Sequence, residues 1–474
     1  MRKAGSHYEI DMTQGPLLSK IIRFSVSLIL TNLLQLLYNA ADLIVVGQFS
    51  ESGTALAAVG ATGSMTSLIV NAFIGLSVGA SVLVAQGYGT GNRESTNKAV
   101  HTSISIALIS GVIVAVIGLL FSRTFLEWMD TSPDIIDQSS TYVKIYFIGA
   151  PFNMLYNFGG AILRATGDTK RPFYFLTISG LVNVVLNLFF VIVLHLDVAG
   201  VALATIISQG ISATLIILCL MKQDGLCHLS LRCLSIDGAS LKKILSIGLP
   251  ASIQSSVFSI SNILIQSSIN SFDLVFAGMG KAPYTTGSAA SGNIEGFVAV
   301  AINAFYHAAL NFTGQNYAAK KYKRTDKVLI ECIACTAVAA TVLGVLCLAF
   351  GKNLLRIYIP ADEEAVGYGY RRLFILCSTY MLCGIMDVMV GQLRGLGKSV
   401  VPMMVSIIGI CGFRIFWIET FFALNRSWEM LFLSYPISWI LTGSVHFICY
   451  LFLRREFPKN EDVDLVKSAE TTVP

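Results

Sequence analysis

Asp42 stands out because it places a carboxylate in an otherwise apolar stretch. It is preceded by Ala41 and followed by the run Leu43–Val46. An ionisable side chain inside such a stretch is energetically costly, so it usually faces a polar cavity and has a function. On a helix, Gln35, Tyr38 and Asp42 follow at i, i+3 and i+7 and share one face. These residues predict a polar site built around one acid.

Further polar side chains recur at helical spacing in the first half of the chain. Asn183 and Asn187 are four residues apart in an apolar run, Asn153 and Asn157 repeat that spacing, and Thr205 lies in the following run. Together with Asp42, such groups would suit a proton or Na⁺ site. The alternative for the asparagines is hydrogen bonding between membrane helices.

The second half of the chain contains two acids of its own within apolar runs, Glu295 and Asp387. Each could bind a cationic substrate or titrate. The alternative is a structural ion pair with a basic residue such as Arg394 or Arg414.

Composition indicates the class of protein that must position these groups. The chain has 474 residues, of which 54% are hydrophobic and only 13% charged, about half the usual charged share of roughly 25%. Long runs without charge recur throughout, each about the 20 residues that a membrane-spanning helix needs. We therefore predict an all-α polytopic membrane protein, and we exclude a soluble enzyme, a nucleic-acid binder and a secreted disulfide scaffold.

Apolar windows bounded by charged or turn residues predict twelve spans. Their approximate ranges are 18–48, 54–86, 97–122, 135–164, 171–195, 198–222, 241–270, 286–317, 326–351, 365–394, 399–424 and 428–454. Most of the 33 Lys and Arg residues fall on one side of this arrangement, including both ends of the chain. The excess of basic residues in cytoplasmic loops predicts that both termini are cytoplasmic.

An internal repeat indicates two related halves. The segment Leu163–Pro172 reads LRATGDTKRP, and Leu393–Pro402 reads LRGLGKSVVP. Because six spans return the chain to its starting side, the halves are expected to be parallel six-helix bundles with a V-shaped central cleft, as in alternating-access transporters. The predicted organisation is a cytoplasmic segment 1–17, an N-lobe 18–222, a linker 223–240, a C-lobe 241–454 and a cytoplasmic tail 455–474.

Several motifs, in order along the chain, resemble the multidrug and toxic compound extrusion (MATE) transporters, most closely their DinF-like bacterial branch. They are Leu33–Gly47, Ala55–Gly60, Ala85–Gly89, the repeated Leu-Arg-x-x-Gly of Leu163 and Leu393, and Gly314–Tyr317. The resemblance covers roughly residues 15–455.

The resemblance implies residue roles. Asp42, Asn183, Asn187 and Thr205 would form the cation or proton coupling network of the N-lobe. The candidates for substrate binding are Gln35, Tyr38, Asn153, Asn157, Glu295 and Asp387. This sequence departs from the family at Asn187, where many relatives have aspartate, and at Ser27, where the first helix usually has proline. Phe258 and Cys383 replace acids that some Na⁺-coupled relatives use.

We therefore expect a monomeric, multi-pass protein of the plasma membrane, surrounded by lipid, that exports small organic and often cationic compounds in exchange for H⁺, with Na⁺ the less favoured ion. We expect no catalytic residues, metal site, further cofactor or nucleic-acid partner. One alternative is a flippase for lipid-linked oligosaccharides, which should need a cationic cavity. Another is a membrane enzyme or receptor, for which no HExxH or Walker motif appears.

Overall fold

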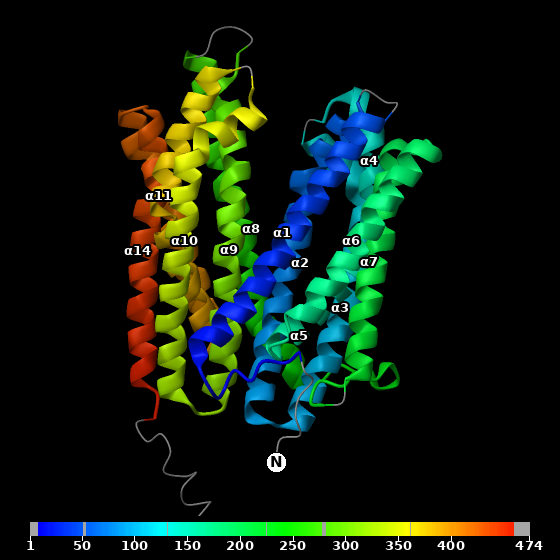
Figure 1. Cartoon of the computed structure of the whole chain (residues 1–474), viewed down its shortest axis with the longest axis vertical. Helices are drawn as coiled ribbons and strands as arrows, with labels where there is room; N and C mark the ends of the chain where they lie inside the picture. The colour runs from blue at the N-terminus through cyan, green and yellow to red at the C-terminus, as the bar shows by residue number, and fades with distance from the viewer. Residues whose placement is uncertain are drawn as a thin grey trace, which may run out of the picture. The chain divides into compact units, whose positions relative to one another are not determined.

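The computed structural model describes residues 8–50, 54–129, 131–223, 225–276, 281–360 and 362–458. Every regular element in these ranges is a helix, which confirms the all-α prediction (Figure 1). The elements are α1 Leu17–Phe49, α2 Ala55–Thr90, α3 Arg93–Trp128, α4 Pro133–Ile148, α5 Ala150–Ala165, α6 Lys170–Leu188, η1 Phe189–Val193, α7 Asp197–Lys222, η2 Leu231–Cys233, α8 Gly238–Phe276, α9 Pro283–Ala318, α10 Tyr322–Tyr358, α11 Glu363–Gly395, α12 Val400–Ser406, η3 Ile407–Gly412, α13 Phe413–Trp417, η4 Ile418–Phe422 and α14 Trp428–Arg455.

Among the described residues, ten helical stretches are long and apolar enough to cross a membrane. The two other predicted spans are the pair α4–α5 and helix α9. The predicted helix 135–164 is interrupted at Gly149, so that α4 and α5 have only 16 residues each. Pro151 follows directly, and a proline inside a helix removes a backbone donor and crowds the preceding turn. Helix α9 has 36 residues but is rich in Gly, Ser and Asn.

The chain divides into two compact units. Unit 1 comprises Arg23–Ile263 and the segment that ends at Ile10, and unit 2 comprises Asp11–Ile22 and the chain from Leu264 onward. The divisions therefore fall within α1 and within α8. The sequence-based domain scheme instead assigned all of the seventh span to the C-lobe, and that scheme stays a prediction.

Unit 1 is held together by close packing of α2, α3, α5 and α7. Its core includes Ile104, Phe158 and Ile216, all less than 2% exposed. Gly159 lies so close to Ile216 that an added Cβ would stand 2.1 Å from that side chain. Small residues at such crossings let membrane helices approach, because lipid supplies no hydrophobic driving force for helix association.

Unit 2 contains α9, α10, α11 and α14 as packed long helices (Figure 1). Helices α9 and α11 approach most closely at Gly287, where an added Cβ would meet the Ala365 carbonyl oxygen at 2.2 Å. An aromatic cluster of Phe272, Tyr284 and Trp428 joins α8, α9 and α14, with ring centroids 5.2–5.4 Å apart. Aromatic contacts of this kind stabilise a packed end of a bundle.

Both copies of the sequence repeat form the same turn. The backbone is left-handed at Gly167 of unit 1, with a φ of 90°, and at Gly397 of unit 2, with a φ of 85°. The amides that follow close each turn: Asp168 N donates to Leu163 O at 2.9 Å, and Lys398 N donates to Leu393 O at 3.0 Å. Glycine tolerates this left-handed backbone, which ends a helix and satisfies its last carbonyls.

Two π-helical segments interrupt the predicted span 399–424. They are η3 and η4, and they flank the five-residue helix α13. A π segment inserts an extra residue into a helical turn and occurs frequently at functional sites.

Candidate functional site

Three helices of unit 1 position the acid that the sequence singled out. Asp42 lies on α1, Asn183 and Asn187 lie on α6, and Thr205 lies on α7. The two asparagines are buried and the Asp42 side chain is half-buried. The i, i+4 spacing on α6 aligns both amides on the face that meets α1 and α7. The structure therefore brings together all four residues of the predicted coupling network.

Hydrogen bonds connect this cluster, which we call the Asp42 network. Asn187 Nδ2 donates to Asp42 Oδ1 at 2.5 Å and lies 3.2 Å from Asn183 Oδ1. The Thr205 hydroxyl also interacts with the carboxylate, and it donates to the Val201 carbonyl at 2.9 Å. One hydroxyl proton serves only one acceptor at a time. Thr205 can therefore change its partner when the charge of Asp42 changes.

One atom of the Asp42 network has no hydrogen-bond partner: the buried Asn187 Oδ1. A carboxylate accepts the amide N–H of Asn187, whereas a protonated carboxyl needs an acceptor for its own O–H. Rotation of the Asn187 amide would present Oδ1 to that proton. The other residues of the Asp42 network can therefore form hydrogen bonds with both the ionised and the protonated side chain of Asp42.

Two tyrosines of α4 that the sequence analysis did not name belong to the same neighbourhood. Tyr142 and Tyr146 both interact electrostatically with Asp42, and Tyr146 is hydrogen-bonded to Gln209 of α7. Their rings are stacked with centroids 6.1 Å apart. The sequence feature that could have indicated these two residues is the i, i+4 spacing of two tyrosines in an amphipathic stretch.

The predicted substrate-binding residues of unit 1 form separate contacts. The Tyr38 hydroxyl donates to the Thr177 carbonyl at 3.3 Å, and its ring lies directly against Gly180. Asn157 Nδ2 donates to Asn153 Oδ1 at 2.8 Å, so these two amides partly satisfy each other. Gln35 is exposed on α1. Their role in substrate binding stays a prediction.

Glu295 of α9 forms a buried ion pair with Arg372 of α11. Arg372 Nε donates to Oε1 and Nη2 donates to Oε2, each at 2.9 Å, and Ser291 adds a bond at 2.8 Å. Arg372 also donates to the carbonyl and hydroxyl oxygens of Ser288. The geometry corresponds to the ion-pair alternative for Glu295. The partner is Arg372, and the suggested partners Arg394 and Arg414 were wrong for this acid.

Asp387 of α11 is half-buried, and Arg394 is the charged residue that interacts with it. Arg394 Nη1 also donates to the Tyr306 hydroxyl at 2.8 Å, and its guanidinium lies 5.8 Å from the centre of that ring. Arg394 is one of the ion-pair partners that the sequence suggests for this acid.

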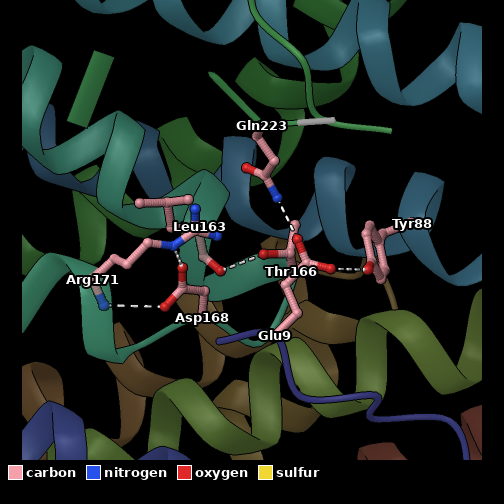
Figure 2. A network of polar contacts seen from close by, with 7 residues as sticks. All are labelled: Glu9, Tyr88, Leu163, Thr166, Asp168, Arg171 and Gln223. Carbon is pink, nitrogen blue, oxygen red and sulfur yellow. Dashed lines mark hydrogen bonds and ion pairs between the residues drawn. The ribbon is translucent and has the colours of Figure 1, made fainter. Parts of the chain in front are cut away.

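A second polar network of unit 1 surrounds the turn between α5 and α6. Figure 2 shows Glu9 accepting hydrogen bonds from the Tyr88 hydroxyl, at 2.7 Å, and from the Gln223 amide. Beside it, the buried Asp168 pairs with Arg171. Burial raises the pKa of Asp168, and the adjacent guanidinium opposes that rise. The network fixes the ends of α2, α5 and α7 and the segment before α1.

The described residues contain no group of three or more His, Cys, Asp or Glu side chains that could hold a metal ion. The Asp42 network offers one carboxylate with amide and hydroxyl oxygens. This donor set suits a proton or a single monovalent cation better than a divalent metal, which prefers several charged or imidazole ligands.

Comparison with protein families gives one match that covers both halves of the chain. The model of the MatE family matches residues 27–189 and 259–417. These ranges include Asp42, Asn183 and Asn187 of the Asp42 network, together with Glu295, Asp387 and Arg414, whereas Thr205 lies between the two ranges.

Individual relatives and solved structures agree with this match. Two Bacillus subtilis proteins, each called a probable multidrug resistance protein, are similar along most of their length. YoeA is 28% identical, and the match covers 83% of this chain and 84% of YoeA. YpnP is 26% identical, and the match covers 94% of this chain and 97% of YpnP. An outward-facing multidrug resistance MATE family transporter has the same fold, with a TM-score of 0.88 and 21% identity over 97% of this chain and all of its own.

Proposed function

Because the chain belongs to the MatE family of membrane transporters, we propose that it is a secondary antiporter that exports small organic compounds in exchange for protons. The family places it in the cell membrane as a multi-pass protein. The names of its relatives support drug-like substrates. We further propose that both termini are cytoplasmic, that coupling is to H⁺ in preference to Na⁺, and that transport proceeds by alternating access.

The observation that carries this proposal is the environment of Asp42. It is the only acid among the four residues of its network, and none of the described Lys, Arg or His side chains forms an ion pair with it. A carboxylate without a fixed cationic partner can gain and lose a proton without breaking a salt bridge. That freedom is what a coupling group requires.

The unpartnered Asn187 Oδ1 supports proton coupling. The protonated carboxyl would use this oxygen as its acceptor, so the network can stabilise the proton-loaded state. Substrate affinity that differs between the two protonation states then supplies the free-energy difference for antiport. Asn187 in place of a second acid also leaves a Na⁺ ion with only one charged ligand.

The experiment is efflux from proteoliposomes under separately imposed pH and Na⁺ gradients. The wild type should export an organic cation against its gradient when a pH gradient is imposed, and an Na⁺ gradient alone should drive little. Asp42→Asn should abolish uphill export while leaving expression intact. Asp137→Asn is a matched control, because Asp137 is an exposed acid of the same unit that pairs with Arg123 at 3.0 Å.

Efflux by Asp42→Asn at the wild-type rate under a pH gradient would move the coupling role to another acid. Export that follows the Na⁺ gradient and ignores pH would contradict proton coupling itself.

A further inference from the structure

Arg414 is a buried cation in unit 2 for which the described residues provide no acid. It lies on α13, inside a candidate membrane span, and is 5% exposed. Its Nε atom has no hydrogen-bond partner. No carboxylate of the described residues lies within ion-pair distance of its guanidinium.

The four groups that interact with Arg414 are neutral, and two of them are aromatic. Its guanidinium carbon lies 3.9 Å from the centre of the Tyr435 ring, and it also interacts with Tyr380, Cys383 and Cys411. An aromatic face attracts a cation but accepts no N–H bond in the plane of the guanidinium fork. The attraction of Tyr435 therefore leaves the in-plane donors of Arg414 to other partners.

The two neighbouring arginines of unit 2 are accounted for. Arg372 is held in two parallel bonds by Glu295, and Arg394 interacts with Asp387 and the Tyr306 hydroxyl. Glu295 and Asp387 are thus each engaged by another arginine. Arg414 is the guanidinium left without a negative partner in this part of unit 2.

A buried charge without a counter-ion is strongly disfavoured, and within a membrane span it is a sign of function. The helix around Arg414 shows a second unusual feature, because π-helical segments precede and follow α13. Such segments are frequent at functional sites.

We propose that Arg414 anchors a binding site in unit 2 for an organic anion, a carboxylate or phosphate group attached to an aromatic ring. The planar fork of arginine matches the two oxygens of such a group. The aromatic part of the ligand would lie against Tyr435, Tyr380 and Trp439, whose rings are 5.5–5.8 Å apart.

The ligand can reach the guanidinium past side chains that are only partly covered. Tyr380, Cys383 and Tyr435 are half-buried, and Arg414, with which they interact, is buried. This site is separate from the Asp42 network of unit 1. A binding measurement on it succeeds or fails independently of proton coupling.

Equilibrium dialysis of naphthoate against the purified protein in phosphatidylcholine nanodiscs tests the assignment. The wild type should bind naphthoate at least about tenfold more tightly than the neutral amide naphthamide, because only the acid pairs with the guanidinium. Naphthyl phosphate should compete with naphthoate. Arg414→Met should reduce naphthoate affinity about tenfold or more, and Arg414→Lys should retain part of it.

Arg371→Met is the control, since Arg371 is exposed on α11 and pairs with Glu429 at 3.4 Å. It should bind naphthoate as the wild type does. Equal binding of acid and amide by the wild type would overturn the proposal, and this comparison needs no variant to fold. Unchanged binding by a folded Arg414→Met would also overturn it. Loss of naphthoate binding in nanodiscs that contain phosphatidylglycerol would assign the site to a lipid headgroup and contradict a soluble aromatic anion.

Discussion

Glu295→Gln should destabilise the protein, because the structure places Glu295 in a buried ion pair. Both oxygens of Glu295 accept from Arg372 at 2.9 Å, and the two side chains are 8% and 14% exposed. Glutamine keeps one acceptor oxygen but turns an N–H₂ group toward Nη2, so one charge-assisted bond becomes a contact between two donors. Breaking a buried pair by removing one partner costs about 3–5 kcal/mol, since the other charge stays buried.

The assay is denaturant unfolding in detergent, followed by circular dichroism, on a double-mutant cycle. Glu295→Gln and Arg372→Met should each lower the free energy of unfolding by about 3–5 kcal/mol. The double variant should lose clearly less than the sum, because it leaves no uncompensated charge. Glu363→Gln is the control, since Glu363 forms its pair with Arg356 at the surface, and it should change stability little.

The opposite result would restore the substrate-binding role that the sequence suggested for Glu295. In that case Glu295→Gln would unfold like the wild type, export of cationic compounds would fall, and export of neutral compounds would be spared. Such an outcome would refute the structural reading of the pair.

Three further substitutions test local contacts. Gly180→Ala should lower the melting temperature and displace Tyr38, because the new Cβ would stand 1.8 Å from that ring. Gly210→Ala is the control and should be tolerated, because its new Cβ would have its nearest neighbour at 3.9 Å. Thermal unfolding of both variants measures the difference. Glu9→Ala should increase the rate of amide hydrogen exchange in the segment before α1, because it removes the acceptor of two hydrogen bonds. An unchanged exchange rate would show that the network of Figure 2 does not hold this segment. Hydrogen bonds from Ser240 lower the pKa of Asp237 below its usual range. Its ionised form therefore stabilises the start of α8 at neutral pH, and this contribution is lost below about pH 4, as the pH falls through the lowered pKa. The difference in melting temperature between the wild type and Asp237→Asn should disappear in strong acid, and a difference that persists there would contradict the assignment.

Much of the coupling network could be predicted from sequence because its spacing is local. Asn183 and Asn187 share a helix face by the periodicity of α6, and an acid inside an apolar run narrows the choice to Asp42. The contact of Asn187 with Asp42 joins residues that lie far apart in the chain. The resemblance to a family supplied that long-range information, and the family match confirms the resemblance.

The partner of Glu295 could not be predicted in the same way. Arg372 follows Glu295 by 77 positions and lies on another helix. No local sequence periodicity connects Glu295 with Arg372. A signal existed, since Arg372 is a basic residue well inside the predicted span 365–394, and a buried cation implies an acid nearby. Arg414 has the same property and Arg394 ends the same predicted span as Arg372, so sequence alone gave no reason to choose among the three.

Of the backbone irregularities, too, only some could be predicted from the sequence. The break between α4 and α5 has a visible cause in Pro151, which the hydropathy windows passed over. The π segments around Arg414 have no proline and no residue pattern that marks them. Hydropathy, which records only how apolar a segment is, therefore could not predict them.

In the proposed antiport cycle, Asp42 releases its proton when the substrate binds. Measuring proton release on substrate binding tests this role most directly. Purified protein in weakly buffered detergent solution is mixed with an organic cation that it exports, and a pH indicator records the protons released. The wild type should release protons in proportion to the substrate bound, and Asp42→Asn should bind the substrate and release none. Equal proton release by the wild type and Asp42→Asn would show that another group carries the coupling.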